Sequence, residues 1–264
     1  MTPPTSNPAS NPASPPTSDS TSPPNSIALL SLLQLASAAL PVGAYSYSEG
    51  LEFVIESGRI VSAANLRSWL TRELTHGTVR IDAAVMLRVH RAVISHDRPA
   101  IARWNAWLAA MRETSELRRQ SEQMGRALAD LVRSLDPDLA PWLDAASRID
   151  QLDHEKTHDS INPPTEIQFA IAFGIAAAQS GIDERSSAIG FLQSWVTNGI
   201  GAGVKLIPLG QTDGQRVLRA LDGAIGRAAT FAIEASDAHL ETSGWGLSLA
   251  SMQHETQRVR LFRS

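Results

Sequence analysis

Two histidines and a glutamate at 154–158, in the sequence HEKTH, match the H-E-x-x-H pattern of zinc peptidases. In that pattern a helix presents both histidines to zinc, and the glutamate acts as general base. The chemistry also needs a third protein ligand beside a cleft. Here the motif lies in a polar stretch, 150–165, that lacks a helical face and ends in Pro-Pro. We therefore interpret His154, Glu155 and His158 as part of a solvated loop, at most an adventitious metal site, and keep a zinc metallopeptidase as the alternative.

Three glycines, Gly199, Gly201 and Gly203, resemble a loop that binds phosphate. They follow a helical pattern rather than a strand, and Val204 breaks the G-x-G-x-x-G spacing, so close helix packing is the better interpretation. The chain contains no P-loop sequence, no G-x-S-x-G sequence and no cysteine. We predict that this protein is not an enzyme and that it binds no cofactor itself.

Composition excludes several classes of protein. With 264 residues, of which 43% are hydrophobic, the chain can bury a sizeable core. A net charge of -4 gives no general attraction to nucleic acid or to an anionic membrane. The longest apolar run, 169–178, is about half the length needed to span a bilayer. We expect no nucleic-acid or membrane partner and, because cysteine is absent, a reducing compartment such as the cytoplasm.

The stretch 165–209 predicts the centre of the fold. Ile167 to Ala178 is apolar on nearly every side, as in a helix that is buried all round, and Thr165 and Gln168 form a potential capping box at its start. The segment from Glu184 to Leu206 carries apolar residues at steps of three and four. The inner face expected for this second helix consists of Ile189, Leu192, Val196, Ile200 and Val204. We predict a buried helical hairpin.

The rest of the chain is predicted to form helices that pack around that hairpin. Residues 1–26 are rich in Pro, Ser, Thr and Asn, and we expect them to be a disordered tail without a targeting signal. From residue 27 helical periodicity continues without a strand pattern, including a long helix over 112–135 with a Glu122–Arg126 pair. Further capping boxes are suggested at Ser46–Glu49 and Thr212–Gln215. The prediction is all-α: one compact domain over 27–264 with about nine or ten helices.

The end of the chain, 241–264, combines several arginines with apolar side chains. Arg258, Arg260 and Arg263 lie close to Phe262, and the sequence identifies no partner for them within the chain. Such an end frays unless something holds it. We predict a tail that becomes ordered on a partner protein.

Four stretches taken together resemble one known family, that of the urease accessory protein UreF. They cover 29–52, 116–128 (ELRRQSEQMGRAL), 206–218 (LIPLGQTDGQRVL) and 251–264 (SMQHETQRVRLFRS), in the same order along the chain. The resemblance runs from about residue 27 to the last residue. A helical scaffold unrelated to urease is the other alternative.

The resemblance implies a non-catalytic helical protein that dimerises. It also implies a complex with UreD (UreH in some organisms), the GTPase UreG and apo-urease, in which this subunit is a bridge that modulates GTP-dependent nickel delivery. Nickel and GTP are then handled by the complex.

Partner-binding positions are expected where the matching stretches carry polar or aromatic side chains. Tyr47 stands where many members have His, and it is either a half-buried aromatic or part of an interaction surface. Lys205 either faces UreG or extends into solvent at a helix C-terminus. The complete set of expected partner-binding residues is Tyr47, Glu52, Lys205, Gln211, Asp213, Gln215, His254, Glu255, Arg258, Arg260, Phe262 and Arg263.

Overall fold

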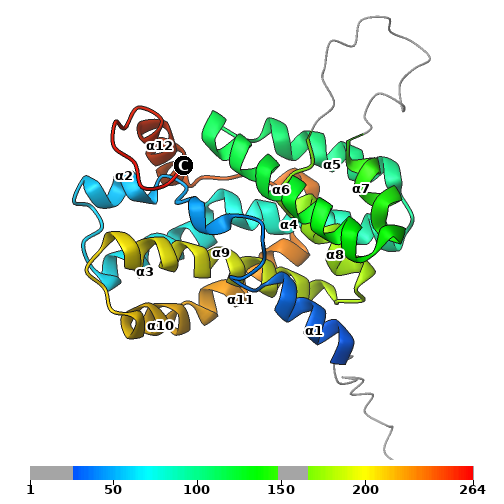
Figure 1. Cartoon of the computed structure of the whole chain (residues 1–264), viewed down its shortest axis with the longest axis horizontal. Helices are drawn as coiled ribbons and strands as arrows, with labels where there is room; N and C mark the ends of the chain where they lie inside the picture. The colour runs from blue at the N-terminus through cyan, green and yellow to red at the C-terminus, as the bar shows by residue number, and fades with distance from the viewer. Residues whose placement is uncertain (1–25, 148–165, 264) are drawn as a thin grey trace, which may run out of the picture.

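Twelve α-helices and no strand make up the part of the chain that the computed structural model describes, residues 26–147 and 166–263 (Figure 1). The all-α prediction is confirmed, with twelve helices rather than nine or ten. The helices are α1 (Ser26–Leu35), α2 (Leu51–Glu56), α3 (Ala63–His76), α4 (Thr78–Ile94), α5 (Arg98–Ala110), α6 (Ser115–Leu135), α7 (Ala140–Ala146), α8 (Phe169–Gln179), α9 (Glu184–Leu206), α10 (Gln211–Ala220), α11 (Asp222–Glu234) and α12 (Trp245–His254). Short 3-10 turns are η1 (Ala44–Ser46), η2 (Pro137–Leu139) and η4 (Asp237–His239).

Helix α8 lies in the core, as its sequence predicts. Every residue from Ala170 to Ala178 is buried, and the helix packs most extensively against α4 and α6. Gly174 permits the closest approach, because a side chain there would stand 2.6 Å from the carbonyl oxygen of Met86 on α4. The predicted pairing of α8 with α9 is a smaller contact, so α4 and α8 form the centre of the fold rather than a hairpin.

The start of α8 differs from the prediction. Gln168 is the N-cap residue and its side chain caps no helical N–H, while Thr165 lies outside the described residues. Other helices supply the acceptors instead: the N–H of Gln168 donates to Asn105 on α5, and that of Phe169 to Ser121 on α6. A buried helix end must satisfy its free N–H groups, and here tertiary contacts do so.

Helix α9 has the predicted bounds. Asp183 caps it by accepting from the N–H of Ser186 at 2.8 Å. Leu192, Val196 and Ile200 are buried as predicted, whereas Ile189 is exposed. The predicted close packing is confirmed at two of the three glycines, because side chains at Gly199 and Gly203 would stand 3.0 and 2.5 Å from Leu70 and Leu66 of α3. Gly201 has no neighbour within 4 Å and borders a cavity.

The other two capping boxes are wrong. Ser46 lies in η1, and α2 begins only after Gly50, whose φ of 78° is in the left-handed region. Gly50 also lies against α12, where a side chain would stand 2.6 Å from the amide nitrogen of Ser251. Thr212 lies inside α10, which begins after Gly210. The N-cap residues of α2 and α10 are therefore glycines, whereas the sequence pattern predicted a Ser or Thr hydroxyl cap.

One predicted ion pair differs from the structure. Two segments that the sequence analysis singled out lie outside the described residues. On α6, Arg126 forms a salt bridge with Glu166 at 2.7 Å rather than with Glu122. The HEKTH motif and the Pro-rich tail, 1–25, lie outside the described residues. Within the described ranges, no helix combines the length and hydropathy that a bilayer crossing requires.

Candidate functional site

The C-terminal segment folds back onto the chain's own α2 and α6. Figure 1 shows α12 and the end of the chain beside α2. The N–H groups of Leu261 and Phe262 donate to the Glu52 carboxylate at 2.6 and 3.0 Å, and Phe262 is buried. The N–H of Arg263 donates to the carbonyl oxygen of Ser46 at 2.9 Å. The expectation that this tail has no partner within the chain is therefore wrong, because its acceptor, Glu52, is about 200 residues away in sequence.

His254 lies between two buried carboxylates. Its Nδ1 is 2.8 Å from Glu116 Oε2, and its Nε2 is 3.2 Å from Glu52 Oε2. All three side chains are almost fully buried, and Arg260 adds a salt bridge to Glu116 at 2.5 Å. We call Glu52, Glu116, His254, Arg260 and Phe262 the tail cluster.

Glu255 connects the tail to the start of α6. Its Oε1 accepts from the N–H groups of Ser115 and Glu116 at 3.0 and 3.2 Å, and from the Ser115 hydroxyl at 2.7 Å. The hydrogen bond from Ser115 lowers the pKa of the Glu255 carboxyl. A carboxylate is favourable here because free N–H groups and the positive end of the helix dipole meet at a helix N-terminus.

Two further expected residues border the tail cluster. The amino group of Lys205 lies 5.3 Å from the centre of the Phe262 ring and 5.9 Å from that of Tyr45, both within cation–π range. Tyr47 is buried, and its hydroxyl donates to Gln123. For Tyr47 the structure therefore shows a core residue, and Lys205 is an exposed cation in the last turn of α9 that also contacts the tail.

The remaining expected residues lie apart from the tail cluster. Gln211 and Gln215 are exposed on α10, and Asp213 forms a salt bridge with Arg216 at 2.7 Å within the same helix. Helix α10 packs against α9 and α3 rather than against the tail. Arg258 is exposed. The expected set thus divides into a tail cluster with its neighbours and an exposed side of α10.

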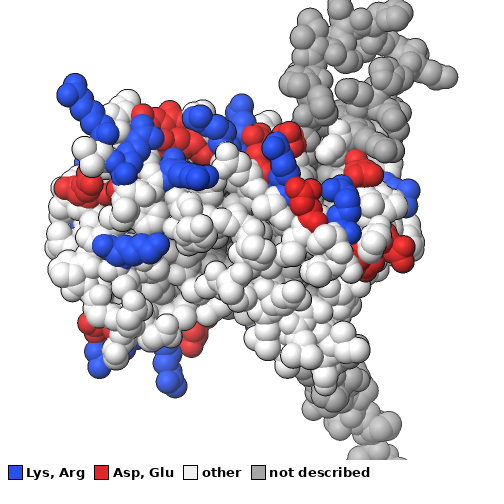
Figure 2. All heavy atoms as spheres, viewed as in Figure 1, with Lys and Arg blue, Asp and Glu red and all other residues white. Residues whose placement is uncertain are grey.

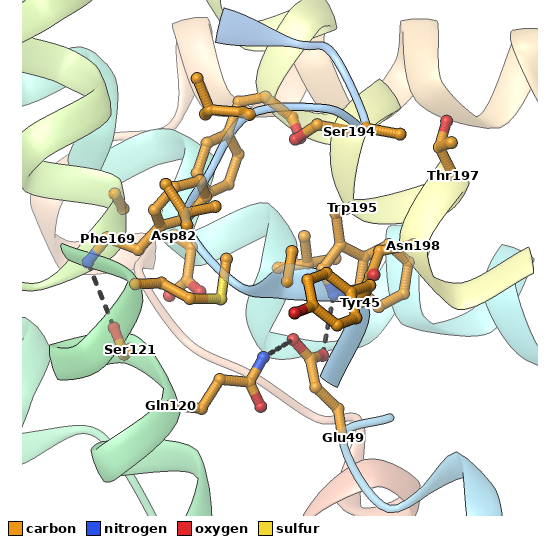
Figure 3. A pocket seen from close by; sticks show the side chains of 18 of the residues that line it. Tyr45, Glu49, Asp82, Gln120, Ser121, Phe169, Ser194, Trp195, Thr197 and Asn198 are labelled. Atoms are coloured by element: carbon orange, nitrogen blue, oxygen red, sulfur yellow. Dashed lines mark hydrogen bonds between the residues drawn. The ribbon is translucent and has the colours of Figure 1, made fainter. Parts of the chain in front are cut away.

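The structure also contains a site that sequence reasoning missed. A cavity of about 330 Å³ lies between the chain after α1 and helices α4, α6, α8 and α9, and Glu49 is in its wall (Figure 3). The Glu49 carboxylate accepts from Trp195 Nε1 and Gln120 Nε2, each at 2.8 Å. In the same cavity, Asp82 pairs with Arg112 at 3.1 Å. Burial raises the pKa of both Glu49 and Asp82.

The sequence analysis interpreted Glu49 as a helix-capping residue, and so did not identify it as part of a cavity wall. Its backbone has a φ of 53°, a region that non-glycine residues seldom adopt, and this turns the side chain inward. Among the described residues, no three His, Asp or Glu side chains gather closely enough to hold a metal ion. The chemistry of the cavity is therefore that of carboxylates among apolar walls.

Comparison with known proteins gives a consistent result. A model of the UreF family matches residues 60–222. The chain is 48% identical over 235 residues to the urease accessory protein UreF of a Nostoc species, covering 89% of this chain and 95% of that protein. It is 44% identical over 247 residues to the UreF of a Synechocystis species, covering 90% and 98%. It is 38% identical over 239 residues to the UreF of Alkalilimnicola ehrlichii, covering 90% and 96%.

Proposed function

The chain belongs to the UreF family of urease accessory proteins, and from this premise we propose that it bridges UreD (UreH) and the GTPase UreG during nickel insertion into apo-urease. The family supports a role in urease maturation. In the proposed mechanism the chain is a non-catalytic chaperone of the cytoplasm. It modulates GTP hydrolysis by UreG, while nickel and GTP are bound by the complex.

The observation that supports a partner at the C-terminal end is the outer face of α12. Trp245, Leu249 and Met252 stand at i, i+4 and i+7 on this helix and have relative exposures of 69%, 58% and 43%. Val259 and Leu261 add exposed apolar surface from the tail. A contiguous apolar face of this kind on a protein surface usually marks an interaction site. We assign it to UreD.

The tail cluster holds this face in position. Glu52 fixes the tail through two backbone N–H groups, and His254 fixes the end of α12. The partner-binding surface is then a rigid helix with an ordered extension, which reduces the entropy lost on binding.

Two more surfaces support the other proposed contacts. The exposed side of α10, with Gln211 and Gln215 one helical turn apart, lies next to the end of α9, where Lys205 is exposed, and we assign it to UreG. Helix α1 has an exposed apolar face without charged residues, in a region that Figure 2 shows as uncharged. A homodimer would cover its exposed residues Ile27, Leu29, Leu30 and Leu33.

Capture of UreD tests the main assignment. In the double variant Trp245→Ala with Leu249→Ala, we expect at least about tenfold weaker binding of UreD, because central aromatic anchors dominate interface energies. Helical content should not change, since both side chains are exposed. Ile94→Ala is the matched control, because Ile94 is an equally exposed apolar residue on α4. Wild-type affinity in the double variant would contradict the assignment.

A further inference from the structure

We propose that the cavity beside Glu49 binds a small organic ammonium ion, that is, a primary amine carried on an apolar body. This goes beyond the proposed bridging function and does not depend on it. The cavity lies between α4, α6, α8 and α9, and Lys205 at its open side is also next to the surface assigned to UreG.

The size and walls of the cavity suit a small organic molecule. Its volume of about 330 Å³ falls within the range of small-molecule pockets, roughly 300 to 1,000 Å³. Apolar and aromatic side chains supply most of the wall, and polar side chains lie among them on several sides (Figure 3). The apolar part of the wall includes Val79, Met124, Phe169, Phe191 and Trp195.

The backbone of Glu49 holds a carboxylate at this wall against a conformational cost. A φ of 53° costs a non-glycine residue roughly 1 kcal/mol or more, and such strain concentrates at functional sites. Figure 3 shows the Glu49 carboxylate between Gln120 and Trp195, below the Tyr45 ring. Two hydrogen bonds, from Gln120 on α6 and Trp195 on α9, hold this carboxylate in place.

Among the described residues, the hydrogen-bond donors to the Glu49 carboxylate are uncharged, while the cations that line the cavity are Arg112 and Lys205. Both groups that donate to Glu49, the Trp195 indole and the Gln120 amide, are neutral. The nearby guanidinium of Arg112 is engaged by Asp82 through both of its terminal nitrogens. Desolvation raises the pKa of Glu49 most, and the charge of Asp82 raises it further, whereas the hydrogen bonds from Trp195 and Gln120 and the charge of Arg112 lower it. An ammonium group supplies a positive charge and strong hydrogen-bond donors for the Glu49 carboxylate.

An organic cation fits this site better than a metal ion does. Two carboxylates, one of them already paired, do not form a metal-binding set, and no such set occurs among the described residues. The apolar walls would contact an alkyl or aryl body, which a hydrated metal ion lacks. The exposed lining residues Tyr45, Gly201 and Lys205 mark the open side through which the body would enter.

Calorimetric titration of the full chain tests the proposal, with n-hexylammonium chloride as the probe at pH 7. We expect saturable binding of one hexylammonium per chain, and at least about tenfold weaker binding of 1-hexanol, which has the same apolar body without the charge. Glu49→Gln should reduce the affinity for hexylammonium at least about tenfold and leave that for hexanol nearly unchanged, since only the ion pair is lost.

A steric variant tests the location without touching the carboxylate. Gly201→Leu adds a side chain into open space on the cavity side of α9, so it should abolish binding while the protein remains folded. Gly226→Leu is the matched control, because Gly226 on α11 also has open space around it but does not line the cavity. The proposal is overturned if hexylammonium fails to saturate, if hexanol binds equally well, or if Gly201→Leu binds like wild type.

Discussion

Buried glutamates occur in two regions of this molecule, and their surroundings differ. In the tail cluster, Glu52 accepts from two backbone N–H groups, Glu116 accepts from Arg260, and each carboxylate is within hydrogen-bond distance of one nitrogen of His254. On the cavity side, Glu49 has only neutral donors. Glu73 of α3 lies deeper still, and its Oε2 has no hydrogen-bond partner.

This difference in hydrogen-bond donors shows under which conditions a buried carboxylate stabilises a fold. Where charged donors surround it, the carboxylate links distant segments and its removal exposes unsatisfied groups. Where such donors are missing, burial favours the protonated form. Burial, followed by the charges of Glu49 and Glu113, raises the pKa of Glu73 to about 8. In the tail cluster the glutamates therefore connect distant segments through several hydrogen bonds, whereas Glu49 and Glu73 have fewer or only uncharged donors.

The largest effect is expected from removing a connector. Glu52→Ala removes the partner of His254 Nε2 and the acceptor of the N–H groups of Leu261 and Phe262, and each buried polar group left unsatisfied costs about 1 to 3 kcal/mol. We expect the free energy of unfolding in urea to fall by about 4 kcal/mol. Glu56→Ala, on the same helix but exposed, should change it by less than about 1 kcal/mol. Equal effects in both variants would remove the distinction between the two regions.

A pH-dependent effect of intermediate size is expected at Glu73. Its folded pKa of about 8 lies above the ordinary value of 4.5, so the native state holds a proton that the unfolded state releases. Its contribution to stability is complete below pH 4.5 and is lost as the pH rises to about 8, at roughly 1.4 kcal/mol per pH unit. Glu73→Gln removes this dependence. The variant should therefore gain roughly 3 kcal/mol over wild type between pH 5.5 and pH 7.5.

Urea denaturation of wild type and Glu73→Gln at several pH values measures this difference directly. Other titrating groups are common to both proteins and cancel in the comparison. A difference that stays constant across this range would show that Glu73 is ionised in the native state.

The smallest effect is expected at the edge of the tail cluster. Arg260 is partly exposed, and its salt bridge to Glu116 is accompanied by hydrogen bonds to the carbonyl oxygens of Glu255 and Gln257. Arg260→Ala should lower the free energy of unfolding by about 1 to 2 kcal/mol, the usual range for a charge-assisted contact. The exposed Arg258 provides the control, with an expected change below about 0.5 kcal/mol for Arg258→Ala. Thermal denaturation of the two variants measures this: Arg260→Ala should lower the melting temperature, and it should do so by more than Arg258→Ala does.

Local sequence determined the helices and much of their burial. Period and composition predicted a buried α8 and an α9 with the observed bounds. Two of the three glycines of α9 allow the predicted close packing. These features depend on interactions within a few residues, which a repeating pattern of side chains records. The family resemblance also lay in short motifs that can be read directly.

Tertiary structure alone decided which distant polar groups meet. The sequence offers no sign that Glu52 receives His254 and the end of the chain, or that Asn105 and Ser121 take the place of a capping box at α8. Nor does it indicate that Glu49, turned inward at a φ of 53°, faces a cavity instead of capping a helix. A hydrogen bond needs two groups at about 3 Å, and for groups far apart in sequence only the packing of whole helices sets that distance.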